Sequence, residues 1–157
     1  MLKHRIIILL LLGGILTCSS DGVGQAMTFQ QIIKTKIQHY YKAIESHNFD
    51  WVKPFYTDTM ACFFDRYNVV PDRDLRAVFE AYWKDRVKEE RHEINWNDWQ
   101  YQEDTEGNYI VTYRFRYDYK LIEPNEVDEV NQWKSVQRKL EMRFNKNYLI
   151  YYIKSVH

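Results

Sequence analysis

The segment 55–86 constrains the fold of this chain more than any other part of the sequence. It contains the end of a short helix, a strand of mixed polar and aromatic residues near 60–69, and then a second, strongly amphipathic helix. Pro71 and Asp72 are typical of a helix start. The apolar residues that follow have the spacing of one buried helix face, and they are Leu75, Val78, Phe79, Tyr82 and Trp83. The segment therefore predicts a helix that packs one face against a core.

Two further helices are predicted before this segment. Thr28 followed by Gln31 is a capping-box pattern, which opens a long helix with an apolar stripe. The stripe contains Phe29, Ile32, Ile33, Ile37, Tyr40, Tyr41 and Ile44. This helix ends at 47–48, and Asp50 caps a second helix that Pro54 keeps short.

The second half of the chain has the alternating pattern of long β-strands. Strands are predicted at 92–103, 109–121, 133–144 and 148–156. Three helices followed by hairpin-connected strands predict an α+β fold, with the helices packed on a curved, mostly antiparallel sheet. Because no linker divides the chain, residues 28–157 are predicted to form a single domain.

Four features of the sequence together resemble one known fold family. They are the helix end at 40–50, the turn Phe55-Tyr56-Thr57-Asp58, the strand residues Phe63-Phe64-Asp65 and the helix at 75–83. Their order and spacing resemble the nuclear transport factor 2-like (NTF2-like) superfamily, which includes ketosteroid isomerases and SnoaL-type cyclases. The resemblance covers the chain from about residue 28 onward. It implies a cone-shaped, cystatin-like fold, and it carries information about the fold rather than about one activity.

The resemblance also implies a set of pocket residues, because these proteins place a pocket between their first helices and the concave face of the sheet. The implied lining is Tyr40, Phe55, Phe79, Trp83, Trp96, Tyr113 and Phe115. Aromatic side chains at these spacings are also typical of a filled core, so either an open pocket or a packed cone is expected. Arg138 is predicted on the apolar face of its strand. There it needs an anionic partner, such as Asp65 or a ligand carboxylate, unless it extends into water at an edge.

Two functions follow from the comparison with the isomerases. Those enzymes use a tyrosine late in the first helix as oxyanion donor and a carboxylate as proton-abstracting base. Tyr40 matches the donor, but Phe64 stands at the position of the base and Asp65 follows one residue later. A one-residue offset turns a strand side chain to the opposite face. We therefore expect a non-catalytic domain that binds a small apolar or amphipathic ligand, or a protein partner. The alternative is a SnoaL- or isomerase-type enzyme that uses Tyr40 and Asp65.

Residues 1–26 have the pattern of a secretory signal peptide. A basic start at 3–5 precedes an apolar run at 6–16, which is too short for a membrane span of roughly 20 residues. Cleavage before Cys18 would leave a lipid-anchored lipoprotein, whereas cleavage after the small residues at 24–26 would release a soluble protein. The sequence thus predicts export, to the periplasm or as a membrane-anchored lipoprotein, or else secretion.

Charge and cysteine content exclude several classes of function. The chain has 22 basic and 22 acidic residues, and removal of Lys3 and Arg5 with the signal segment leaves no basic excess. Binding to nucleic acid, or to membranes other than through a lipid at Cys18, is therefore not expected. Cys62 would be the one cysteine of the mature chain, and it is expected to be a small buried side chain rather than a nucleophile.

No metal site or cofactor site is predicted. The histidines are scattered without metal-ligand spacing, and no phosphate-binding loop is present. Glu89, Glu90 and His92 form the one polar cluster near a helix end, and they are expected to lie on a solvated surface.

The strand at 92–103 has an inconsistent alternation. Ile94 and Trp96 share one face, whereas Trp99 and Tyr101 lie on the other. Either a β-bulge near residues 97–98 restores the alternation, or both faces are covered. The second option would place Trp99 at the centre of a homodimer formed through the outer face of the sheet.

Overall fold

The computed structural model describes residues 27–122 and 132–156 of the chain. Its helices are α1 (Phe29–Glu45), α2 (Phe49–Val52) and α3 (Arg76–Asp85), with a 3-10 turn at Lys53–Phe55 and a π-helical turn at Pro71–Leu75. Its strands are β1 (Met60–Phe63), β2 (Arg66–Val69), β3 (Val87–Glu103), β4 (Tyr109–Leu121), β5 (Lys134–Phe144) and β6 (Ile150–Ser155). The predicted signal segment, with Cys18, lies outside the described residues.

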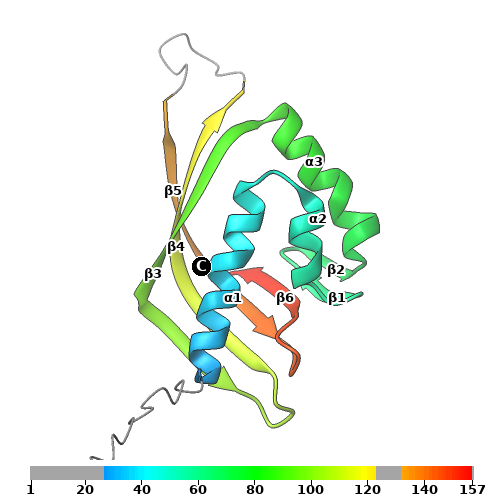
Figure 1. Cartoon of the computed structure of the whole chain (residues 1–157), viewed down its shortest axis with the longest axis vertical. Helices are drawn as coiled ribbons and strands as arrows, with labels where there is room; N and C mark the ends of the chain where they lie inside the picture. Colours follow the sequence, from blue (N-terminus) through cyan, green and yellow to red (C-terminus); the bar gives the residue numbers. More distant parts are fainter. Residues whose placement is uncertain (1–26, 123–131, 157) are drawn as a thin grey trace, which may run out of the picture.

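The six strands form one sheet in the order β2-β1-β6-β5-β4-β3. Neighbouring strands are antiparallel, except that β1 and β6 are parallel. Helix α1 lies across one side of this curved sheet, and α2 lies between α1 and α3 (Figure 1). The predicted α+β class, with three helices on a mostly antiparallel sheet, is confirmed.

Helix α1 begins with the predicted capping box. The Thr28 hydroxyl accepts a hydrogen bond from the Gln31 backbone N–H, and the Gln31 side chain accepts one from the Thr28 N–H. The buried face of the helix contains Ile33, Ile37, Tyr40, Tyr41, Ala43 and Ile44. Within residues 27–122 and 132–156, no helix is long and apolar enough to cross a membrane.

Residues 60–69, expected as one strand, form the hairpin β1–β2. The chain reverses at Phe64 and Asp65, and Phe64 has a φ of +58°, which large side chains rarely adopt. No glycine or Asn-Gly pair marks this turn, so the sequence contains none of the usual hairpin signals. The reversal leaves Asp65 exposed at the tip of the hairpin.

A β-bulge interrupts β3. It was one of the two explanations predicted for the inconsistent alternation of this strand. The register with β4 shifts between Asn95 and Gln100. As a result, Trp96 and Trp99 lie on the same face as α1, with ring centroids 5.4 Å apart and the Lys34 ammonium 5.3 Å from each ring. Trp99 therefore packs against the core rather than on the outer face of the sheet.

The outer face of the sheet is charged. Arg114 forms an ion pair with Asp98 at 3.0 Å, and Arg116 forms ion pairs with Glu93 and Asp118. A homodimer through this face would have to bury these ion pairs, which is costly. The homodimer stays a prediction, and Trp99 no longer offers it an apolar centre.

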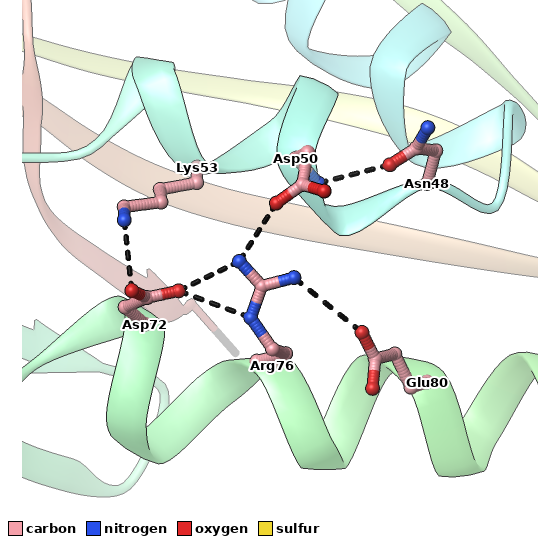
Figure 2. Close-up of polar contacts among 6 residues, drawn as sticks. All are labelled: Asn48, Asp50, Lys53, Asp72, Arg76 and Glu80. Carbon is pink, nitrogen blue, oxygen red and sulfur yellow. Dashed lines mark hydrogen bonds and ion pairs between the residues drawn. The ribbon is translucent and has the colours of Figure 1, made fainter.

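An ion-pair network joins α2 to α3 (Figure 2). The Arg76 guanidinium lies 2.7 Å from both Asp50 and Asp72, and the Lys53 ammonium lies 2.8 Å from Asp72. The Asn48 side chain accepts a hydrogen bond from the Asp50 N–H and so caps α2. These contacts orient α3 toward the helices that precede it, and α3 forms one wall of the cavity described next.

Candidate functional site

A cavity of about 460 Å3 lies between α1, α3, the β1–β2 hairpin and the sheet. Most of its lining is apolar or aromatic, and the lining residues come from elements that are far apart in sequence. They are Tyr40, Tyr41, Ile44, Phe63, Phe64, Val78, Phe79, Tyr82, Glu90, His92, Phe115, Tyr117, Arg138, Leu140, Ile153 and Ser155. The cone is therefore not completely filled by its own side chains.

The mouth of the cavity is marked by its exposed lining residues. Phe64, Val78 and Tyr82 are 39%, 41% and 38% exposed. Arg138 is also exposed and forms no ion pair with any residue in the described ranges. The sequence predicted either an anionic partner for Arg138 or a side chain that extends into water. The structure shows the second of these.

Glu90 supplies a buried carboxylate to the cavity. It is 7% exposed and is the one charged residue in the core of the described chain. The Trp83 indole N–H donates to Glu90 Oε1 at 2.7 Å, and His47 Nε2 lies 3.2 Å from the same oxygen without the alignment of a hydrogen bond. The expectation of a solvated surface was therefore wrong for Glu90.

His92 lies between two carboxylates. Its backbone N–H donates to Glu45 Oε1 at 2.7 Å, its Nδ1 lies 3.4 Å from the same oxygen, and its Nε2 lies 3.9 Å from Glu90 Oε2. The ring is held between Tyr41 and Tyr117, with centroids 4.5 Å and 5.0 Å away. Burial alone raises the pKa of Glu45, but hydrogen bonds from His92 and Lys42 outweigh it and lower the pKa to about 2.

Two phenols complete the polar side of the cavity. The hydroxyl oxygens of Tyr82 and Tyr117 are hydrogen-bonded at 2.7 Å. Burial is the main cause that raises the pKa of Tyr117 far above its usual value, with further contributions from Tyr82 and Glu90. The pKa of Tyr82 is raised as well, again mainly by burial. Both phenols therefore stay neutral and can donate or accept hydrogen bonds.

The structure brings together half of the residues predicted to line a pocket. Tyr40, Phe79, Phe115 and Arg138 line the cavity, whereas Phe55, Trp83, Trp96 and Tyr113 do not. The second group has other packing roles: Trp83 donates to Glu90, and the Tyr113 hydroxyl bonds that of Tyr41 at 2.9 Å. Any contact of these residues with a ligand stays a prediction.

Tyr40 and Asp65, the pair that the isomerase alternative requires, do not converge. The Tyr40 hydroxyl is hydrogen-bonded to the Tyr56 hydroxyl at 2.8 Å, and burial raises the pKa of Tyr40 well above its usual value. Asp65 is exposed at the hairpin tip and does not line the cavity, whereas its neighbour Phe64 does. The sequence predicted that the one-residue offset would separate Asp65 from the site. The structure shows this separation, and it arises at the turn between β1 and β2.

Glu90, His92 and Tyr117 were not predicted as site residues, although the sequence contains a signal for Glu90 and His92. Ile94 and Trp96 were placed on one strand face, and extending the same alternation toward the N-terminus adds His92 and Glu90. The strand was expected to start at His92, but β3 starts at Val87. The polar residues at its start were therefore assigned to a helix end.

No group of histidine, cysteine or acidic residues in the described ranges has the arrangement of a metal site. Cys62 is 1% exposed, its thiol donates to the Phe64 carbonyl at 3.2 Å, and burial raises its pKa. The prediction that Cys62 is a small buried side chain is confirmed. A thiol in this setting is a poor nucleophile.

Comparison with known proteins shows the fold. No family model and no curated protein matches the sequence. An NTF2-like superfamily protein from Salmonella enterica serovar Typhimurium superposes with a TM-score of 0.62 at 8% identity, covering 81% of this chain and 89% of that one. An uncharacterized cystatin fold protein from Novosphingobium aromaticivorans gives a TM-score of 0.54 at 13% identity, with 80% and 97% covered. This chain has the NTF2-like fold.

The NTF2-like resemblance stated from the sequence is thus confirmed at the level of the fold. An NTF2-like protein of unknown function from Exiguobacterium sp. 255-15, with a TM-score of 0.50 and 15% identity, covers 77% of this chain and 96% of that one. Identities this low carry no activity across. The function has to be inferred from the cavity itself.

Proposed function

We propose that the cavity of this NTF2-like domain binds a small, largely apolar organic molecule. The observation that carries the proposal is an open space of about 460 Å3 lined mostly by aromatic and aliphatic side chains. Glu90, Tyr82 and Tyr117 bring polar groups to the same space. Small-molecule sites typically combine a volume of about 300–1,000 Å3 with an apolar lining and a few convergent polar groups.

The geometry favours binding over isomerase chemistry with Tyr40 and Asp65. A general base must come within hydrogen-bond reach of the proton that it removes. Asp65 is outside the cavity, and the Tyr40 hydroxyl already has Tyr56 as its partner. We therefore propose a binding domain and assign no catalytic role to either residue.

Replacement of Val78 by tryptophan tests the binding proposal. Val78 is an exposed lining residue on α3, so a larger side chain can fill the mouth without disturbing the core. We expect the affinity for the neutral fluorescent probe N-phenyl-1-naphthylamine to fall by about tenfold or more. Probe fluorescence titrations on the purified domain would measure the change.

Ala77→Trp is the matched control for this experiment. Ala77 is exposed on the same helix and does not line the cavity, so probe affinity should stay as in the unsubstituted protein. Equal loss of binding in both variants, or no loss in Val78→Trp, would contradict binding in this cavity. Failure of the unsubstituted domain to bind the probe would do so as well.

We also propose that the domain is exported and anchored through a lipid at Cys18. The support is the basic start, the short apolar run and the cysteine that follows it in the sequence. In a bacterial host, the full chain should appear in the membrane fraction with a mass that matches an acylated protein starting at Cys18. Cys18→Ala should lose the lipid mass. A Cys18→Ala protein with the same mass shift would show that the modification lies elsewhere.

A further inference from the structure

The cavity is electrostatically asymmetric. Its buried part contains the Glu90 carboxylate, whose side chain is 3% exposed, whereas the cationic Arg138 is exposed at the mouth. The Tyr82 phenol lines the same cavity, and its hydroxyl is hydrogen-bonded to that of Tyr117. A ligand that fills the cavity therefore meets negative charge at the inner end and positive charge at the outer end.

The buried carboxylate is only partly compensated by the protein. Glu90 Oε1 accepts one aligned hydrogen bond, from the neutral Trp83 indole. His92 Nε2 is 3.9 Å from Oε2, beyond hydrogen-bond distance, and His47 Nε2 is a buried atom without an aligned partner. Burial of a carboxylate is costly unless charged or hydrogen-bonding partners offset it. The neutral Tyr117 phenol also interacts with Glu90, but no cationic group makes an aligned hydrogen bond to this carboxylate within the described residues. Glu90 thus has capacity for a charged donor.

Aromatic rings line the same cavity as this carboxylate. Tyr41, Phe115 and Tyr117 line the cavity beside Glu90, and their rings form a continuous group through His92. The faces of aromatic rings attract cations, most strongly where water is excluded. A carboxylate within a group of aromatic rings is the chemistry that recognises a protonated amine.

We propose that the ligand of this cavity carries a protonated amine that pairs with Glu90, while its apolar part contacts the aromatic and aliphatic lining. The inference rests on the proposed binding function and specifies its ligand class. An anionic group at the same position would be repelled by Glu90. A neutral hydroxyl would gain a hydrogen bond but no charge pairing, and charge-assisted hydrogen bonds are roughly twice as strong as neutral ones.

Competition with the fluorescent probe tests the ligand class. Octylamine, octanol and octanoate have the same chain and differ in the charge of one group. In the unsubstituted domain at pH 7, we expect octylamine to displace N-phenyl-1-naphthylamine at a concentration about tenfold lower than octanol. Octanoate should displace the probe least well of the three.

Glu90→Gln supplies the matched variant, because glutamine keeps the shape of the side chain and an acceptor for the Trp83 N–H. This change should remove the preference for octylamine over octanol. Glu89→Gln removes a charge from the neighbouring, exposed position and should keep the preference. Circular dichroism and probe binding would verify that each variant is folded.

The outcomes separate the ligand class from the binding function. If the probe binds but octanol or octanoate displaces it as well as octylamine does, the amine proposal is overturned and the binding proposal stands. The same conclusion follows if Glu90→Gln keeps the preference. If the probe does not bind the unsubstituted domain, both proposals fail. The comparison among the three ligands needs no variant, so it remains decisive even if Glu90→Gln does not fold.

Discussion

Replacement of Tyr113 by alanine is expected to lower the free energy of unfolding by about 3–5 kcal/mol. Tyr113 is completely buried in β4. Its ring lies against Tyr41 and Phe115, with centroids 6.4 Å and 6.2 Å away, and its hydroxyl is hydrogen-bonded to that of Tyr41. Alanine would leave a cavity at the centre of the sheet and remove the partner of a buried hydroxyl.

Tyr113→Phe separates the two contributions. This variant keeps the ring and removes only the hydroxyl, so we expect a loss of about 1–3 kcal/mol from the unpaired Tyr41 hydroxyl. Urea unfolding followed by circular dichroism would give both values. A loss below about 1 kcal/mol for Tyr113→Ala would contradict the packing described for this residue.

The stability of the domain is expected to decrease in acid because of Glu45. In the folded protein, hydrogen bonds from His92 and Lys42 outweigh the opposing effect of burial and hold the pKa of Glu45 at about 2. In the unfolded chain the pKa is near 4.3. A pKa that is lower in the folded state stabilises the protein above the unfolded value and ceases to do so as the pH falls through the folded value. The stabilisation should thus be complete above about pH 5 and decline toward about pH 2.

Glu45→Gln isolates this contribution. Since Glu45 is half-buried and solvent screens part of the interaction, we expect the variant to be less stable by about 1–2 kcal/mol near pH 7. The difference should shrink as the pH is lowered toward 3. Urea unfolding at pH 7, 5, 4 and 3 would measure it. Glu103→Gln, at an exposed position in β3, serves as the control. A Glu45→Gln difference that stays constant over this range would rule out the linkage.

Much of the fold could be predicted because its signals are local. The capping box at Thr28 and Gln31 and the period of α1 lie within one segment, and so does the alternation along β4. Residue spacing alone limits which face each side chain can occupy. The hairpin at Phe64 and Asp65 was not predicted, because a short turn without glycine departs from regular geometry over only two residues. The bulge in β3, in contrast, was one of two predicted alternatives, because the inconsistent alternation of this strand indicated it.

The cavity was harder to predict because its polar groups meet only through tertiary contacts. Glu45 ends α1 and His92 lies in β3, yet the His92 N–H donates to the Glu45 carboxylate. Glu90 is buried where Trp83, in the last turn of α3, donates to it across the helix–strand junction. In the sequence these residues form a charged run, which is the usual pattern of a solvated surface. Packing of α3 over the start of β3 instead buries Glu90.

The sequence by itself determined the helices, the alternating faces of β4 and the NTF2-like resemblance, since each depends on the spacing of neighbouring residues. It also indicated that segment 55–86 marks a scaffold without the isomerase base, because the offset between Phe64 and Asp65 is visible in the order of residues. Only the tertiary structure decided whether the cone is open and which charge it encloses. Those properties depend on how completely side chains from distant segments fill a shared volume, and on the low-dielectric surroundings that they create for Glu90.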